Sequence, residues 1–150
     1  MPMAIRKQED ITLTTARELM SPHVACAHTG DSVVDAARKL AATHDGALPV
    51  CDANGTLMGM LTDRDIVLKV VAQQSDPLTV RVGDLVGVVP YVVQADADVT
   101  TALKAMAEHR VSRIPVLEGT KLVGILAEAD LARALAHRIP AREAEIGSAP

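Results

Sequence analysis

Gly59, Thr62 and Asp65 have the spacing Gly-x-x-Thr-x-x-Asp, which could hold a phosphorylated sugar. We expect Thr62 to lie where a strand turns into a helix, and the free N–H groups and positive dipole at that helix start favour a phosphate. The Thr62 hydroxyl can donate to a phosphate oxygen, and the ionised Asp65 carboxylate can accept from both hydroxyls of a ribose. The same Thr-x-x-Asp spacing resembles a helix capping box, which needs no ligand, and spacing alone favours this interpretation.

The two cysteines, Cys26 and Cys51, both fall on expected strands of the N-terminal half of the chain. If those strands are neighbours, a disulfide between them is geometrically possible. The matching residues of the C-terminal half, Val92 and Leu117, are apolar, so two small buried thiols are the alternative. Two cysteines are too few for a disulfide framework.

His23, Cys26 and His28 raise the question of a metal site, with His44 and Cys51 as extra donors. Their spacing lacks the CxxC and HExxH patterns that mark zinc sites, so we expect no metal. The chain also lacks a nucleophile elbow, a Walker A loop and a convergent Ser/His/Asp order. We therefore expect a protein without enzyme activity and without a required cofactor.

The composition limits the partners of the chain. Its 150 residues are 49% hydrophobic and 23% charged, which favours a packed interior over disorder. A net charge of −4 argues against a nucleic-acid partner, and because Tyr91 is the only aromatic residue, a planar ligand would lie between aliphatic side chains. No apolar run is long enough for a membrane span and residues 1–10 lack the apolar part of a secretory signal, so we expect a cytoplasmic protein that contacts no membrane.

An internal repeat organises these residues. Residues of the first half match residues that lie 66 positions further along the chain. The turn of the second half is one residue shorter than the turn at 52–56, so beyond this turn the offset is 65. A unit of about 60 residues is marginal alone, so we expect the two units to share a core and to leave a ligand cleft between them. The identities are Leu19/Leu85, Val33/Val99, Ala36/Ala102, Ala41/Ala107, Pro49/Pro115, Val50/Val116, Leu57/Leu122, Gly59/Gly124, Leu61/Leu126 and Asp65/Asp130.

Each unit is expected to have the order β-α-β-β-α, preceded by a short helix that begins near Thr15 with a Thr15-x-x-Glu18 capping box. Ser32 and Asp98 occupy matching N-cap positions. The expected strands are 24–27, 47–51 and 57–61, then 91–93, 113–117 and 122–126; the expected helices are 33–41, 63–72, 99–106 and 128–136. We divide the chain into a tail (1–12), a first repeat (13–72), a linker (73–78), a second repeat (79–137) and a tail (138–150).

Four segments, 46–50 (GALPV), 59–65 (GMLTDRD), 112–116 (SRIPV) and 124–130 (GILAEAD), lie in register with this repeat. With them the chain resembles a tandem pair of CBS domains, the Bateman module, of the stand-alone bacterial hypoxic-response type, from about Thr14 to His137. The resemblance implies an α/β (α+β) fold of two β-α-β-β-α repeats packed sheet to sheet with pseudo-two-fold symmetry. It also implies a regulatory module, often a homodimer, that binds an adenine nucleotide such as AMP, ADP or ATP between the repeats.

In the family, the residues that match Thr62 and Asp65 contact the phosphate and the ribose. The second copy keeps Asp130 but has Ala127 in place of the threonine. Arg113 matches a position that often carries a basic phosphate contact in the family, whereas a cation at the end of a strand, exposed to solvent, is the alternative.

The first copy has Ala47 where the second has Arg113, and Arg64 could compensate for the missing cation. Neither copy of the motif is complete by the family pattern. Val24, Leu48 and Ile114 could sandwich an adenine, and core packing is their alternative role.

The sequence therefore leads to two functional hypotheses. The first is a non-enzymatic sensor that binds an adenine nucleotide and regulates an unknown downstream protein. The second is a dimeric stress-response interaction protein that needs no nucleotide and carries a Cys26–Cys51 redox pair.

Overall fold

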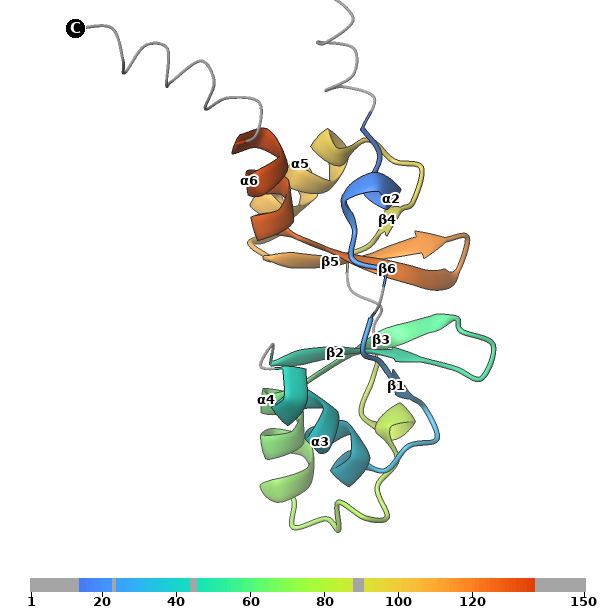
Figure 1. Cartoon of the computed structure of the whole chain (residues 1–150). Coiled ribbons are helices and arrows are strands. Elements are labelled where there is room, and N and C mark those ends of the chain that lie inside the picture. Colours follow the sequence, from blue (N-terminus) through green and yellow to red (C-terminus); the bar gives the residue numbers. More distant parts are fainter. Residues whose placement is uncertain (1–13, 23, 44–45, 88–90, 137–150) are drawn as a thin grey trace, which may run out of the picture.

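The computed structural model describes residues 14–22, 24–43, 46–87 and 91–136. It has two halves of similar design, each with a sheet of three strands. The two sheets face each other across the middle of the molecule, and the longer helices cover their outer sides (Figure 1). This is the arrangement expected for two repeats packed sheet to sheet.

The first half contains β1 (Ala27–His28), α3 (Val33–Thr43), β2 (Ala47–Cys51) and β3 (Leu57–Thr62), followed by α4 (Asp63–Ile66), which continues as a π-helix, η1 (Val67–Val71). Strand β2 lies in the middle of the sheet, parallel to β1 and antiparallel to β3. The second half repeats this order with β4 (Val93–Gln94), α5 (Val99–His109), β5 (Arg113–Glu118), β6 (Lys121–Ala127) and α6 (Glu128–Ala136). The expected order β-α-β-β-α is confirmed in both halves.

The predicted caps of the two long helices are also confirmed. The Ser32 hydroxyl accepts a hydrogen bond from the Asp35 N–H at 3.2 Å, and the Asp98 carboxylate accepts one from the Thr100 N–H at 2.9 Å. Because a side-chain oxygen satisfies an N–H group that has no partner within the helix, each cap marks where its helix begins.

The expected capping box at Thr15 is wrong, although the short helix α2 (Ala16–Leu19) is present. The Thr15 side chain makes no cap hydrogen bond. The first N–H groups of α2 instead donate to backbone carbonyls of the second half, from Ala16 to Ala97 at 2.9 Å and from Arg17 to Ala95 at 3.0 Å. The backbone of the other half therefore does what a side-chain cap would do.

Two expected strands are also displaced. The β-prone segments 24–27 and 91–93 form strands only at 27–28 and 93–94, because only those residues pair with a neighbouring strand. Strand propensity depends on a partner, and Val24 has none in this sheet.

The halves exchange their leading segments, residues 14–21 and 80–85, which we call the crossing segments. The Val99 N–H donates to the Thr14 carbonyl at 3.0 Å, and at the matching place in the other half the Val33 N–H donates to the Val80 carbonyl at 3.1 Å. The first crossing segment contributes apolar side chains to the core of the second half, and the second to the core of the first. These side chains are Ala16, Leu19 and Met20 from the first segment and Val80, Val82 and Leu85 from the second.

Gly124 makes the first crossing possible. The N–H groups of Ser21 and Ile125 donate to each other's carbonyls at 2.8 and 3.0 Å, which draws the crossing segment against β6. A Cβ atom at Gly124 would lie 2.4 Å from the Met20 sulfur and 2.9 Å from the Ser21 carbonyl oxygen. Glycine is therefore required by the close approach of the two backbones.

The tips of the two hairpins join the halves a second time. The Leu57 N–H donates to the Thr120 carbonyl and the Leu122 N–H to the Gly55 carbonyl, both at 3.1 Å. A small apolar cluster lies beside these bonds, formed by Cys51, Leu57 and Leu117 with Val92 and Leu122.

Candidate functional site

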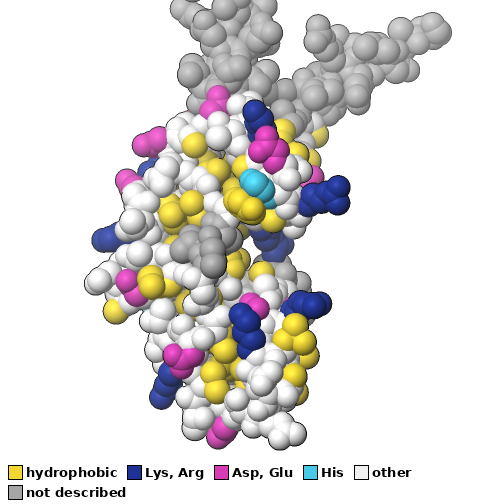
Figure 2. All heavy atoms as spheres, turned by 180° about the vertical axis from the view of Figure 1, so that it is seen from behind, with side chains coloured by type: hydrophobic (Ala, Val, Ile, Leu, Met, Phe, Trp, Pro, Cys, Tyr) yellow, Lys and Arg dark blue, Asp and Glu magenta, His cyan; other side chains and the backbone are white. Residues whose placement is uncertain are grey.

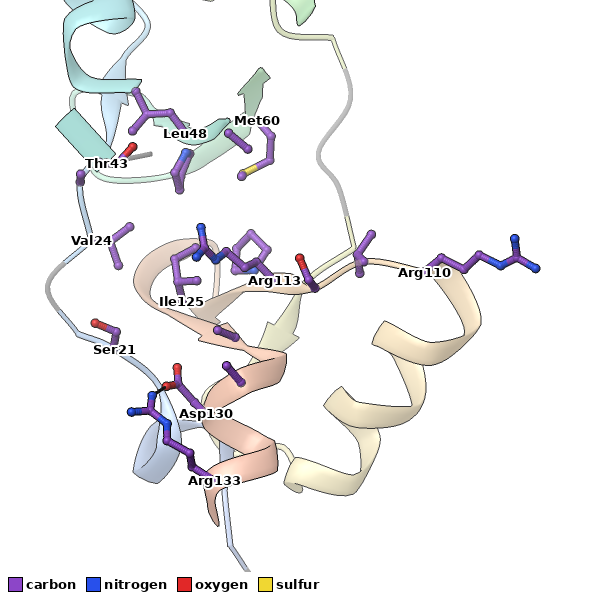
Figure 3. A pocket seen from close by; sticks show the side chains of 18 residues that line it. Ser21, Val24, Thr43, Leu48, Met60, Arg110, Arg113, Ile125, Asp130 and Arg133 are labelled. Atoms are coloured by element: carbon purple, nitrogen blue, oxygen red, sulfur yellow. Dashed lines mark hydrogen bonds and ion pairs between the residues drawn. The ribbon is translucent and has the colours of Figure 1, made fainter. Parts of the chain in front are cut away.

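A cleft of about 990 Å³ lies between the halves, and both halves contribute to its walls (Figure 3). Its size is at the upper end of what small-molecule sites enclose. The lining residues of the first half are Ser21, Val24, Ala25, Thr43, Ala47, Leu48, Pro49 and Met60. Those of the second half are Arg110, Val111, Ser112, Arg113, Pro115, Ile125, Ala127, Ala129, Asp130 and Arg133.

The cleft is positioned by the first crossing segment and by the ends of the strands. Ser21 and Val24 follow α2 along one wall, and Met60 and Ile125 come from β3 and β6 (Figure 3). Leu48 also lines the cleft but is almost fully buried, so most of its surface packs in the core of the first half.

The charged groups of the cleft come from the second half. Asp130 lies in the first turn of α6 and forms an ion pair with Arg133, three residues further along the helix. In Figure 3 Arg113 points into the cleft, whereas Arg110 points away from it. The cleft therefore combines one carboxylate and two guanidinium groups with aliphatic walls.

The Asp130 carboxylate keeps accepting capacity in this arrangement. Arg133 is its hydrogen-bonding partner within the described part of the chain, and Ala127 provides no hydroxyl at the helix start. A carboxylate has about four lone-pair positions, so the bond from Arg133 leaves room for about three further donors.

Thr62 and Asp65 form the capping box that their spacing predicts. The Asp65 N–H donates to the Thr62 hydroxyl and the Thr62 N–H donates to the Asp65 carboxylate, both at 3.0 Å. Lys69 lies 3.4 Å from the other carboxylate oxygen. Neither Thr62 nor Asp65 lines the cleft described above, and their role toward a ligand stays a prediction.

The remaining predicted site residues divide between the cleft and other surroundings. Val24, Leu48, Arg113 and Asp130 come together around the cleft. Arg64 is exposed on α4 and Ile114 is fully buried in the core of the second half, so the cleft includes neither.

Sequence analysis missed Arg133 and Ile125. Arg133 follows Asp130 by three residues on a helix, which is the spacing at which an acid and a base meet on one face, so the helical periodicity carried a usable signal. Ile125 alternates with the buried Leu126 along β6 and so faces the opposite side of the sheet, toward the other half.

Cys26 and Cys51 are free thiols in this structure, and a disulfide between them stays a prediction. Cys51 is buried and Cys26 is half-buried. Burial, together with the neighbouring Cys26 thiol, raises the pKa of Cys51 to about 11. Both thiols and His28 line a second, smaller hollow of about 170 Å³.

The described residues hold no group of three or more His, Cys, Asp or Glu side chains arranged to bind a metal ion. Of the residues considered as donors in the sequence, His23 and His44 lie outside the described part of the chain. His28 lies beside Asp31, with Nδ1 at 3.9 Å from the nearer carboxylate oxygen. No described helix has the length and apolar character that a bilayer span requires.

Comparison with known proteins finds a single family along most of the chain. The model of the CBS domain matches residues 16–72 and 82–137. Hypoxic response protein 1 of Mycobacterium tuberculosis is 43% identical over 123 residues, which cover 82% of this chain and 86% of that protein. The CBS domain-containing protein YhcV of Bacillus subtilis is 35% identical over 124 residues, which cover 80% of this chain and 84% of the relative.

Two solved structures share the fold. The crystal structure of Hypoxic Response Protein I with two coordinated zinc ions has 43% identity and a TM-score of 0.71, and the match covers 80% of this chain and 98% of that one. The crystal structure of CBSX2 in complex with AMP has 29% identity and a TM-score of 0.69, over 82% of this chain and 96% of that one.

Replacing Asp65 by Asn should lower the stability by about 1 kcal/mol at neutral pH, because it removes the carboxylate from the capping box and from the Lys69 ion pair. Burial raises the pKa of the Asp65 carboxyl, but the hydrogen bonds with Thr62 and the charge of Lys69 outweigh it and hold that pKa below its usual value. A group whose pKa is lowered by folding stabilises above its unfolded pKa, and this contribution is lost as pH falls through the folded value.

Urea unfolding at several pH values measures the contribution of the Asp65 carboxylate to the free energy of unfolding. The difference between wild type and the Asp65→Asn variant should be full at pH 7 and should shrink below about pH 4, the usual range of an aspartate. The matched control is Asp63→Asn, which alters the neighbouring exposed acid and should change stability by less than about 0.5 kcal/mol. A difference that is constant from pH 7 to pH 3 would contradict the role assigned to the Asp65 charge.

Proposed function

Since the chain belongs to the CBS domain family and consists of a tandem pair of such domains, we propose that it is a regulatory module that binds an adenine nucleotide between its halves. The observation that carries the proposal is the cleft in which Asp130, Arg113 and Arg133 lie beside aliphatic walls. The AMP complex of the related CBSX2 supports the choice of ligand.

Each part of an adenine nucleotide has a group of matching chemistry in the cleft. The base lies between the aliphatic side chains of Val24, Met60 and Ile125, because the cleft has no aromatic side chain. The Asp130 carboxylate accepts from the ribose hydroxyls, and the guanidinium groups of Arg113 and Arg133 receive the phosphate. The sugar is assigned to Asp130 rather than Asp65, because Asp130 lines the cleft and Asp65 does not.

Binding in such a cleft changes how the two halves are held together. One wall follows the first crossing segment and the opposite groups lie on β5, β6 and α6, so a ligand contacts both halves at once. A ligand shifts a conformational equilibrium only by its difference in affinity for the two states. A ligand that bridges the halves has this difference, and the downstream partner responds to the resulting arrangement.

The ligand is tested by calorimetry of the purified chain with AMP, ADP and ATP. Replacing Asp130 by Ala should weaken AMP binding roughly tenfold to a hundredfold, because it removes charge-assisted hydrogen bonds of about 1.5–3 kcal/mol. Asp63→Ala removes an acid that does not line the cleft and should leave affinity within about twofold. Failure of all three nucleotides to bind at millimolar concentration would overturn the proposal.

The proposal includes a homodimer. The closing helix of the first half exposes Val67, Leu68 and Val71, which are 54%, 47% and 63% exposed. The matching positions of the second half carry Ala132, Arg133 and Ala136, so this apolar surface exists in only one half. Contiguous exposed apolar surface is costly in water, and a second copy that presents the same surface about a two-fold axis would cover it.

Sedimentation equilibrium should give the mass of two chains for the wild type. Replacing Val71 by Lys should shift the distribution to single chains, because two like charges would meet across the two-fold axis. Ala136→Lys at the matching position of the second half is the control and should leave the dimer intact. A wild type that sediments as a single chain at all concentrations would contradict the dimer.

A second candidate function is a thiol redox pair, and the small hollow that Cys26 and Cys51 both line favours it. Oxidation would join the two sulfurs, release two protons and pass two electrons to an added disulfide oxidant such as oxidised glutathione. Burial raises the pKa of Cys51 to about 11 and so disfavours its thiolate, and we assign the attack to the more accessible Cys26.

Counting thiols before and after treatment with oxidised glutathione tests whether Cys26 and Cys51 form a disulfide. Two thiols per chain should disappear in the wild type, without a disulfide between chains. In Cys26→Ser the buried Cys51 should stay reduced, whereas in Cys51→Ser the half-buried Cys26 should form only a mixed disulfide with glutathione. Two free thiols after oxidation of the wild type would remove this candidate.

A further inference from the structure

Three consecutive residues, Val24, Ala25 and Cys26, separate the cleft from the small hollow that both thiols line, and we call them the partition. Of these two cavities, Ala25 lines the cleft, Cys26 lines the hollow, and Val24 lines both. Figure 3 shows Val24 on the wall of the cleft. A movement of the partition toward the hollow therefore changes the shape of the cleft.

The backbone holds the two thiols with different firmness. Cys51 belongs to β2, the middle strand, which pairs with β1 on one side and with β3 on the other. Its carbonyl also accepts a hydrogen bond from the Thr29 N–H at 3.0 Å. The partition precedes β1, and within the described part of the chain no backbone hydrogen bond holds Val24 or Ala25. When the two sulfurs approach each other, the partition is therefore the part that moves.

The opposite wall of the hollow belongs to the second half and is fixed in place. It includes Leu122 and Val123 of β6. The Leu122 N–H donates to the Gly55 carbonyl at 3.1 Å, and Cys51 packs with Leu117 and Leu122 in the small apolar cluster beside the hairpin tips. The hollow can therefore narrow by a movement of the partition while the two halves stay joined.

We propose that the redox state of Cys26 and Cys51 controls the affinity of the cleft for its nucleotide, with the partition as the moving part. In the reduced chain, Val24 stays on the cleft wall and packs against the base. A bond between the sulfurs draws Cys26 toward Cys51 and takes Val24 away from the cleft, so the oxidised chain binds the nucleotide more weakly. The inference rests on the proposed function and on the thiol pair, and it couples the two.

The oxidation is a thiol–disulfide exchange with oxidised glutathione. The Cys26 thiolate attacks one sulfur of oxidised glutathione and releases the first glutathione. Cys51 loses its proton and displaces the second glutathione from Cys26. The protein gains one S–S bond and loses two protons, while the S–S bond of oxidised glutathione is broken and its two halves take up two electrons.

Calorimetry with AMP, on the reduced chain and on the chain oxidised with oxidised glutathione, tests the coupling, and thiol counting shows the state of each sample. Oxidation should weaken AMP binding about fivefold to tenfold, because the base loses part of the apolar surface that Val24 provides. The double variant Cys26→Ser with Cys51→Ser should bind AMP within about twofold of the reduced wild type, with and without oxidant.

Val24→Ala and Val123→Ala are a matched pair of variants. Both remove two methyl groups from the lining of the hollow, and of the two residues only Val24 also lines the cleft. Val24→Ala should weaken AMP binding to the reduced chain about fivefold and should lose most of the response to oxidation. Val123→Ala should keep both the affinity and the response within about twofold.

The coupling also acts in the opposite direction, because two linked equilibria change each other by the same factor. AMP should stabilise the dithiol form and raise the midpoint potential of the thiol pair by about 30 mV for a tenfold difference in affinity. Equilibration of the wild-type chain in glutathione buffers, with and without saturating AMP, measures this shift, so the test does not depend on the folding of a variant.

The outcomes separate the proposals. An oxidised chain that binds AMP as tightly as the reduced chain, or more tightly, would overturn the coupling while nucleotide binding and the thiol pair stand. A full response to oxidation in Val24→Ala would overturn the role of the partition. Thiols that resist oxidation would remove the thiol pair and the coupling together, with nucleotide binding left intact. No binding of AMP to the reduced wild type would overturn the proposed function and the inference with it.

Discussion

The architecture depends on the exchange of the two crossing segments between the halves. Each segment gives its apolar side chains to the core of the other half, and its backbone bonds there replace side-chain caps. Neither half can therefore complete its core without the other, in keeping with the small surface that a unit of about 60 residues buries. The first crossing segment also leads Ser21 and Val24 to the wall of the cleft. The same exchange therefore completes the cores and shapes the cleft.

The parts of the fold that follow from local physics could be predicted from the sequence. The strands at 47–51 and 113–118 alternate with turns and caps whose chemistry lies within a few residues, and the repeat supplies each element twice. The crossing could not be predicted this way, because it depends on pairings such as Thr15 with Asp98, far apart in the sequence. The error at the Thr15 cap has this origin: a distant backbone competes with a side chain for the same N–H groups.

The candidate site, like the fold, could be predicted from the sequence only in part. The Thr62-x-x-Asp65 spacing fits both a cap and a sugar site and by itself favours the cap, and the coordinates show the cap formed and the carboxylate paired with Lys69. Asp130 lies in the weaker copy by sequence because Ala127 replaces the threonine. Among the described residues Arg133 donates to the Asp130 carboxylate, and Ala127 offers it no hydroxyl, so the less complete motif keeps acceptor capacity for a ligand.

The pseudo-two-fold axis makes the two sides of the molecule dependent on each other. Ala47 and Arg113 are counterparts in the repeat and both line the cleft, so Arg113 supplies a cation where the first half has none. An anionic ligand in the cleft meets the guanidinium groups of Arg113 and Arg133 from the second half, whereas the described lining residues of the first half are uncharged.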